Sequence, residues 1–131
     1  ETAVTILEKV GHFLDEENNR IYNKYSDSLS KKDISLKIEE ELDVCNILQN
    51  SFKDFDGGYA LAGMIGHGSS FVARDPNGIR PLYYYVNDEV IVGTSERPPI
   101  KTAFGCEFDE IKELKRGNAL IVDKVGKYKI E

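Results

Sequence analysis

The residues whose types and spacing offer the most chemistry lie in one nine-residue stretch, which reads Arg-Asp-Pro-Asn-Gly-Ile-Arg-Pro-Leu over residues 74–82. Arg74, Asp75 and Arg80 place three charges on a segment that its prolines and glycine mark as a tight turn. Opposite charges at this spacing form charge-assisted hydrogen bonds, so we expect the three side chains to brace the turn. Direct contact with a substrate is the alternative role for them.

Two cysteines and two histidines are the other reactive side chains. Cys45 and Cys106 are too few for a disulfide framework and lack the spacing of metal ligands. Each stands among apolar neighbours, which favours a small core residue over a reactive thiol. His12 and His67 form no H-x-x-x-H pair, and the sequence therefore predicts no metal site.

The composition limits the class of protein. A chain of 131 residues corresponds to about one domain, and 40% hydrophobic with 31% charged residues is typical of a folded globular protein. The net charge of −6 argues against a nucleic-acid-binding surface. No apolar run approaches the roughly 20 residues of a membrane-spanning helix, and no signal peptide is visible, so we expect a cytoplasmic protein. The chain begins with Glu, which we interpret as the start of a processed product or of a piece of a longer protein.

The chain divides near Asp56 into two parts of different composition. Residues 1–56 carry seven basic and thirteen acidic side chains, whereas residues 57–131 carry ten of each sign and ten of the eleven glycines. Because glycine and proline punctuate turns, the first part should be helical and the second should contain short strands. Apolar residues at three- and four-residue spacing predict amphipathic helices over residues 3–24 and 31–53.

Short segments rich in Tyr, Val and Ile follow, separated by turns that contain Gly, Pro and Asn. This pattern predicts a meander of antiparallel strands. The expected strands cover residues 59–65, 70–74, 82–86, 89–93, 119–123 and 127–130, with one short helix over 99–104. The strands are apolar nearly throughout, so both faces should be covered. The fold class is therefore α+β, with two amphipathic helices followed by antiparallel strands.

With its flanks, the nine-residue stretch resembles the R-D-P-x-G-x-R-P-L signature of the class II (Ntn-type) glutamine amidotransferases, most closely the amidophosphoribosyltransferase family. The signature positions are Arg74, Asp75, Pro76, Gly78, Arg80, Pro81 and Leu82. The segments that follow the family's pattern around it are Gly57-Gly58-Tyr59-Ala60, Gly66-His67-Gly68, Thr94-Ser95-Glu96 and the closing strand from Glu113 to Val122. Within these segments, Ser95 and Glu96 complete the set of signature residues. Arg116 and Asn118 depart from the family's Pro and Glu, which affects only the boundary of one turn.

This resemblance implies an Ntn-hydrolase-like αββα sandwich, in which two antiparallel sheets lie between helices. Residues 1–131 would form part of a type 2 glutamine amidotransferase domain, namely the C-terminal part of a glutaminase domain. In the family, this domain hydrolyses the side-chain amide of glutamine, and a second domain uses the ammonia to displace pyrophosphate from phosphoribosyl pyrophosphate. The product is phosphoribosylamine, an intermediate of purine synthesis. The parent enzyme is then expected to need Mg²⁺, to form a homo-oligomer, and to bind neither nucleic acid nor membranes.

The catalytic residues of the family do not map onto this chain. Their nucleophile is a cysteine at the mature N-terminus, whose own α-amino group acts as the base. Residue 1 is Glu, and Cys45 and Cys106 are internal. The family's substrate-binding Arg, its Asn-Gly oxyanion pair and its substrate-binding Asp find no match either. We therefore assign no catalytic or substrate-binding residue and expect the chain alone to be inactive.

Two other functions remain open. One is a different class II amidotransferase, such as glucosamine-6-phosphate synthase or asparagine synthetase. The other is a non-enzymatic interaction module that has kept the scaffold and lost its nucleophile. The complete signature, with G-x-Y-A upstream and Ser-Glu downstream, favours the amidophosphoribosyltransferase family over the other amidotransferases.

Overall fold

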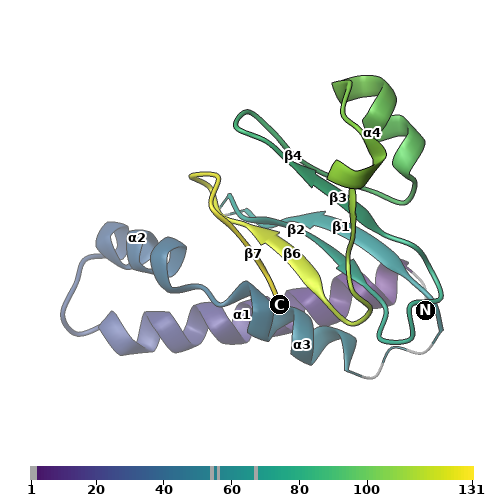
Figure 1. Ribbon diagram of the computed structural model, residues 1–131. Coiled ribbons are helices and arrows are strands. Elements are labelled where there is room, and N and C mark those ends of the chain that lie inside the picture. Colours follow the sequence, from purple (N-terminus) through teal and green to yellow (C-terminus); the bar gives the residue numbers. More distant parts are fainter. Residues whose placement is uncertain (1–2, 54, 56, 67) are drawn as a thin grey trace. The chain divides into compact units, whose positions relative to one another are not determined.

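A computed structural model describes residues 3–53, 55, 57–66 and 68–131. These residues form two compact units, Glu1–Asp56 and Gly57–Glu131 (Figure 1). The division falls where the charge and glycine content of the sequence change. The first unit is helical and the second contains all the described strands, which agrees with the expectation from composition.

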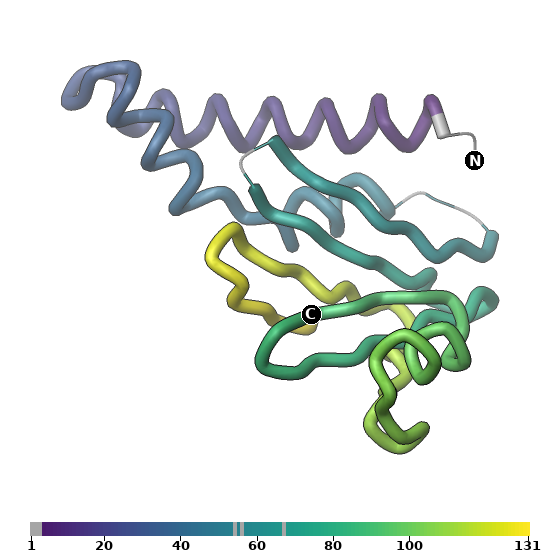
Figure 2. The backbone as a smooth tube through the Cα atoms, turned by 90° about the horizontal axis from the view of Figure 1, so that it is seen from above, coloured from purple at the N-terminus to yellow at the C-terminus, as the bar shows by residue number. Residues whose placement is uncertain are grey.

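The first unit consists of α1 (Ala3–Tyr25), α2 (Lys31–Glu41) and α3 (Val44–Phe52). Figure 2 shows α2 folding back from the end of α1, and α1 packs against both α2 and α3. Ile21, Ile34 and Ile47 are buried, one from each helix. None of the described helices is both long enough and apolar enough to span a bilayer.

The prediction of one continuous helix over residues 31–53 is wrong, because the helix stops at Glu41 and a new one starts at Val44. Asp43 separates the two helices. Its side chain accepts a hydrogen bond from the backbone N–H of Asn46 at 3.0 Å, which makes Asp43 the N-cap of α3.

Two carboxylates tie α1 to the segment where α2 ends and α3 begins. Glu41 accepts hydrogen bonds from the hydroxyl of Tyr25 and, at 3.3 Å, from Nζ of Lys24. Glu17 is buried and contacts Arg20 at 2.5 Å and the backbone N–H of Asp43 at 3.4 Å. Side-chain contacts of Glu17 and Glu41 therefore hold α1 against the end of α2, in addition to the apolar packing between the helices.

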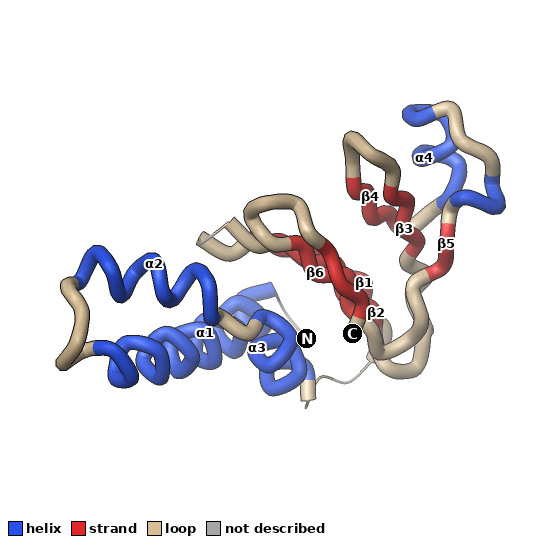
Figure 3. Tube along the Cα trace, turned by 60° about the vertical axis from the view of Figure 1, so that its left-hand side comes forward, coloured by secondary structure: helices blue, strands red, loops and turns tan. Residues whose placement is uncertain are grey.

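The second unit contains two antiparallel sheets. The four-stranded sheet has the order β1 (Ala60–Met64), β2 (Ser70–Arg74), β6 (Ala119–Val122) and β7 (Tyr128–Ile130). The three-stranded sheet has the order β4 (Ile91–Thr94), β3 (Tyr83–Val86) and β5 (Lys112–Glu113). Helix α4 (Arg97–Phe104) packs against β4, and a 3₁₀ turn covers Phe108–Glu110. Figure 3 shows the strands as two separate groups.

The expected α+β class with two antiparallel sheets is confirmed, but the prediction of a simple meander is wrong between β2 and β3. Strand β2 pairs with β1 and β6, whereas β3 pairs with β4 and β5. The signature stretch is therefore a crossover from one sheet to the other, and not the turn of a hairpin.

The expectation that both strand faces are covered holds for β6 and fails for β1. In β6, Ala119, Leu120 and Ile121 are all buried. In β1 the exposure alternates along the strand, and Met64 is 86% exposed. The exposed residues Ala62 and Met64 of β1 border a cavity described below.

The core of the second unit consists of two clusters of buried residues. Around the three-stranded sheet and α4, the cluster contains Tyr85, Ile100, Cys106 and Ile111. Between the sheets, it contains Leu82, Leu114 and Leu120. Both cysteines are free thiols. Cys106 is a small core residue, as predicted, whereas Cys45 in α3 is only half-buried.

Candidate functional site

The centre of the crossover is the side chain of Asp75, which is fully buried. Its Oδ2 accepts a hydrogen bond from the backbone N–H of Ile79 at 2.9 Å. Its Oδ1 accepts from the N–H groups of Arg80 at 3.1 Å and Tyr59 at 3.4 Å. One carboxylate therefore holds the crossover and the segment leading into β1 together.

These donors determine the charge state of Asp75. Burial alone would raise its pKa, but hydrogen bonds from the backbone N–H groups of Ile79, Arg80, Tyr59 and Asn77 outweigh the burial and lower the pKa below the ordinary value of 3.8. Asp75 is therefore ionised at neutral pH, and backbone dipoles stabilise its charge.

Arg74 connects the same crossover to the three-stranded sheet. Its side chain is only 10% exposed. Nε donates to the carbonyl of Arg80 at 2.8 Å, and Nη2 donates to the carbonyl of Gly78 at 3.1 Å. Nη1 donates to Oε1 of Glu113 at 2.8 Å and to the carbonyl of Leu114 at 2.7 Å. Because Arg74 ends β2 and Glu113 belongs to β5, the guanidinium joins the two sheets.

The prediction that charged side chains brace this stretch is thus confirmed for Arg74 and Asp75 and is wrong for Arg80. The guanidinium of Arg80 is exposed, and the residue contributes its backbone N–H and carbonyl to the brace. The two arginines differ because the guanidinium of Arg74 reaches three backbone carbonyls, those of Gly78 and Arg80 in the crossover and that of Leu114 after β5.

The remaining signature residues have local roles in the chain path. Gly78 has a φ of +68°, which glycine adopts without strain. Leu82 is buried in the cluster between the sheets. Pro76 and Pro81 are exposed and flank the turn.

The crossover lies beside a pocket of about 370 Å³, which we call the motif pocket. It is lined by Gly58, Tyr59, Ala60, Arg80, Pro81, Ser95 and Glu96. Three of the segments singled out in the sequence therefore meet at one place, namely the G-x-Y-A segment, the end of the signature and the Ser-Glu pair. Reading the sequence identified these segments but missed their convergence, because it depends on strand pairing across two sheets.

Two residues that line the motif pocket, Gly58 and Tyr59, are constrained by the neighbouring crossover. A Cβ atom added to Gly58 would lie 2.6 Å from Cγ2 of Ile79, so this close approach requires glycine. Burial, and then the charge of Asp75, raise the pKa of Tyr59 above its ordinary value. Its phenol therefore keeps its proton at neutral pH.

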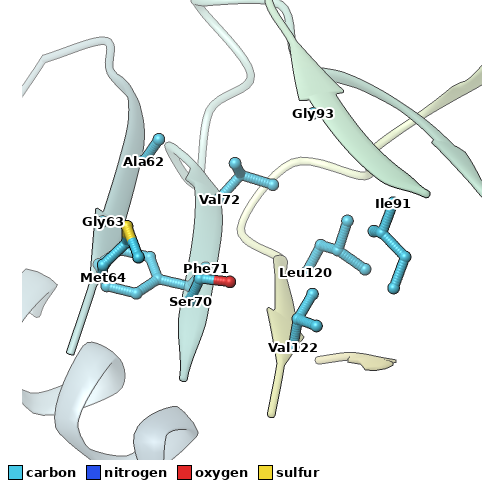
Figure 4. A pocket seen from close by; sticks show the side chains of 10 residues that line it. All are labelled: Ala62, Gly63, Met64, Ser70, Phe71, Val72, Ile91, Gly93, Leu120 and Val122. Atoms are coloured by element: carbon cyan, nitrogen blue, oxygen red, sulfur yellow. The ribbon is translucent and has the colours of Figure 1, made fainter. Parts of the chain in front are cut away.

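A second cavity, of about 470 Å³, lies between the two sheets. Its lining residues are Ala62, Gly63, Met64, Ser70, Phe71, Val72, Ile91, Gly93, Leu120 and Val122. Figure 4 shows side chains from both sheets, including Val72, Leu120 and Ile91, around this space. The lining carries one hydroxyl and no ionisable group, so the cavity suits apolar side chains.

Neither Cys45 nor Cys106 lines either of these pockets. His12 contacts Glu16 on α1 at 3.2 Å, and His67 lies outside the described residues. Among the residues that the structure describes, no three His, Cys, Asp or Glu side chains gather into a group that could hold a metal ion. The Mg²⁺ expected for the parent enzyme is therefore assigned to no residue of this chain.

Comparison with known proteins places these features in a family. A family model described as a glutamine amidotransferase domain matches residues 11–102, which is most of the chain, and the chain belongs to this family. This confirms the resemblance seen in the signature. An amidophosphoribosyltransferase of Lachancea kluyveri is 37% identical over 90 residues, which are 63% of this chain and 16% of that protein.

Solved structures show the same fold. A glutamine phosphoribosylpyrophosphate amidotransferase of B. subtilis, complexed with ADP and GMP, gives a TM-score of 0.52 at 24% identity, over 89% of this chain and 26% of that chain. An allosteric regulatory enzyme of purine biosynthesis gives a TM-score of 0.52 at 22% identity, over 88% of this chain and 26% of that chain. The chain thus spans about a quarter of these structures.

Proposed function

We propose that this chain is part of the glutaminase domain of an amidophosphoribosyltransferase. The observation that carries the proposal is the complete signature, folded as a braced crossover in a chain that belongs to the glutamine amidotransferase family. In the proposed parent enzyme, water cleaves the amide of glutamine to glutamate and ammonia. The ammonia then displaces pyrophosphate from phosphoribosyl pyrophosphate, and phosphoribosylamine is formed.

In this proposal the chain supplies scaffold, and the nucleophile comes from elsewhere in the parent enzyme. Cys45 lies within α3 and Cys106 is buried in the core, and as internal residues neither has a free α-amino group to act as its base. We therefore propose that the catalytic cysteine lies outside residues 1–131. The two free thiols also suit a reducing compartment such as the cytoplasm.

Two strand edges support a partner in the form of the remaining glutaminase domain. Strands β1 and β4 lie at sheet edges, and residues 60–64 and 91–94 contain no charge and no proline. Edges of independent proteins are usually protected by such residues. Both edges border the cavity between the sheets, so the proposed partner would cover apolar surface as well as unpaired backbone. A phosphoribosyltransferase domain, its Mg²⁺ and a homo-oligomeric assembly complete the proposed enzyme.

The test is an ammonia-release assay with glutamine. The 131-residue chain alone should release no ammonia above background, and addition of the remaining part of its glutaminase domain should restore release. Cys45→Ala and Cys106→Ala should leave the restored activity intact. Activity of the chain alone that disappears in either variant would show that the chemistry lies within this chain and would refute the proposal.

A further inference from the structure

The crossover contains the one Asn-Gly pair of the sequence, Asn77-Gly78. An asparagine side chain can react with the backbone nitrogen of the residue that follows it, because attack on its amide carbon closes a five-membered ring. Glycine permits this attack most readily, since it has no Cβ atom beside the attacking nitrogen. Water can reach the pair, because Asn77 is half-buried and Gly78 is exposed. The family signature therefore contains an asparagine amide with a reactive neighbour.

The folded crossover restrains the attacking nitrogen. The N–H of Gly78 donates to the carbonyl of Asp75 at 3.2 Å, which closes a β-turn. The N–H of Asn77 donates to the carboxylate of the same Asp75. After the pair, the N–H groups of Ile79 and Arg80 also donate to this carboxylate, at 2.9 and 3.1 Å. The Gly78 nitrogen can therefore lose its proton and attack only after the turn hydrogen bond breaks.

Two further contacts limit the rotation that the attack requires. Nη2 of Arg74 donates to the carbonyl of Gly78 at 3.1 Å, which holds the peptide group after the pair. A Cβ atom added to Gly78 would lie 3.2 Å from Cβ of Arg116, so the turn that follows β5 packs closely against the pair. Because these contacts exist only in the closed crossover, local opening must precede the reaction.

We propose that Asn77 is a site of spontaneous deamidation, which the closed crossover suppresses and its opening permits. In the first step, the Gly78 nitrogen gives its proton to hydroxide and forms a bond to Cγ of Asn77. The bond from Cγ to the side-chain nitrogen breaks, and that nitrogen takes a proton from water and leaves as ammonia. Water then opens the resulting succinimide ring at either of its carbonyl groups, which gives aspartate or isoaspartate at position 77.

Either product changes the crossover. Aspartate adds a negative charge two residues from the buried carboxylate of Asp75, and like charges at short range repel each other. Isoaspartate adds a methylene group to the backbone between Asp75 and Ile79, which alters the spacing at which the N–H of Ile79 reaches that carboxylate. Since the asparagine is not regenerated, one opening event has a permanent effect on the crossover and on the motif pocket beside it.

The experiment is incubation of the 131-residue chain in mildly alkaline buffer, followed by mass spectrometry of the peptide that contains Asn77. Deamidation of the folded chain should be about tenfold or more slower than that of the chain unfolded in urea. Asp75→Ala should raise the rate in the folded chain about tenfold or more. Arg74→Gln, which removes the contact to the Gly78 carbonyl, should also raise it. Asn77→Gln should give no product, because its attack would need a larger ring.

A matched control separates opening of the crossover from unfolding of the whole chain. Ile47→Val destabilises the helical unit and leaves the contacts of the crossover in place, so the rate at Asn77 should not change. Folded chain that deamidates as fast as unfolded chain would overturn the proposal. So would equal acceleration by Ile47→Val and Asp75→Ala, or no acceleration in either Asp75→Ala or Arg74→Gln.

Discussion

Asp75 is a buried carboxylate whose charge is stabilised by backbone N–H groups, and none of the described residues forms an ion pair with it. Its replacement by alanine leaves the N–H groups of Ile79, Arg80 and Tyr59 without an acceptor inside the protein. We expect Asp75→Ala to lower the free energy of unfolding by about 1–3 kcal/mol, measured by urea denaturation. Asp88→Ala, at an exposed turn, is the control and should change it by less than about 0.5 kcal/mol. Normal stability combined with a raised KM for glutamine in the intact enzyme would instead place Asp75 in a substrate site.

The same carboxylate predicts a dependence of stability on pH. The pKa of Asp75 is lower in the folded chain than its ordinary value of 3.8, so the folded state binds this proton more weakly than the unfolded state. The stabilisation is complete above the ordinary value and is lost as the pH falls through the lower, folded value. The difference in unfolding free energy between the unmodified chain and Asp75→Asn should therefore be constant near neutral pH and shrink in acid below about pH 4. If the difference in unfolding free energy instead grows as the pH falls, the pKa of Asp75 is not lowered in the folded chain.

At the scale of elements, two glycines have opposite roles that substitution should reveal. Gly11 lies inside α1, and a Cβ atom there meets no atom of the described residues within 4 Å. Gly11→Ala should therefore stabilise the chain by about 0.5–1 kcal/mol, because alanine favours the helix. At Gly93 in β4, a Cβ atom would lie 2.9 Å from Cγ1 of Val72 in β2, where the two sheets touch. Gly93→Ala should destabilise the chain.

A second substitution separates this clash from a general intolerance of β4 to alanine. Val72→Ala removes the methyl groups that face Gly93, so the double variant should be more stable than the sum of the two single effects predicts. Thermal unfolding of the unmodified chain, Gly93→Ala, Val72→Ala and the double variant measures the coupling free energy between the two residues. Strict additivity would show that the sheets do not meet at these two residues.

The elements that local patterns define were predictable from the sequence, and those defined by distant contacts were not. Apolar periodicity predicted α1, and turn residues predicted β2 with its exact bounds. The helix break at Asp43 was missed because the apolar steps continue through it, although an Asp three residues before Asn46 is a cap signal. The crossover was mistaken for a hairpin turn because proline and glycine specify a turn and not the partner of the next strand. The two-residue β5 is too short to leave a pattern.

The candidate site shows the same limit. The signature identified the family, and the roles of Arg74 and Asp75 followed from their charges. The exposed position of the Arg80 side chain could not be read from the sequence, because Arg74 and Arg80 are chemically identical and only the chain path distinguishes them. The motif pocket depends on three segments that lie far apart in the sequence, since Arg80 is 20 residues after Ala60 and 15 residues before Ser95.

For the whole molecule, the uncharged edges of β1 and β4 predict self-association of the chain in the absence of its proposed partner. Size-exclusion chromatography with light scattering over a wide concentration range should give a mass that rises above 14.8 kDa with concentration. Addition of the remaining glutaminase domain should replace this species with a defined complex. A compact monomer at all concentrations, with a cooperative thermal transition, would favour an independent module.

The way in which Asp75 holds the crossover also has a consequence for exchange with deuterated solvent. Ile79 is 61% exposed, so by its side chain it resembles any surface loop residue, yet its amide hydrogen is donated to a fully buried carboxylate. Release of that hydrogen requires the crossover to open, and opening would break the contacts of Arg74 to β5 at the same time. The amides of Ile79 and Arg80 should therefore exchange as slowly as those of central β2, and much faster in Asp75→Ala. A segment without regular secondary structure would then be among the last parts of the second unit to take up deuterium.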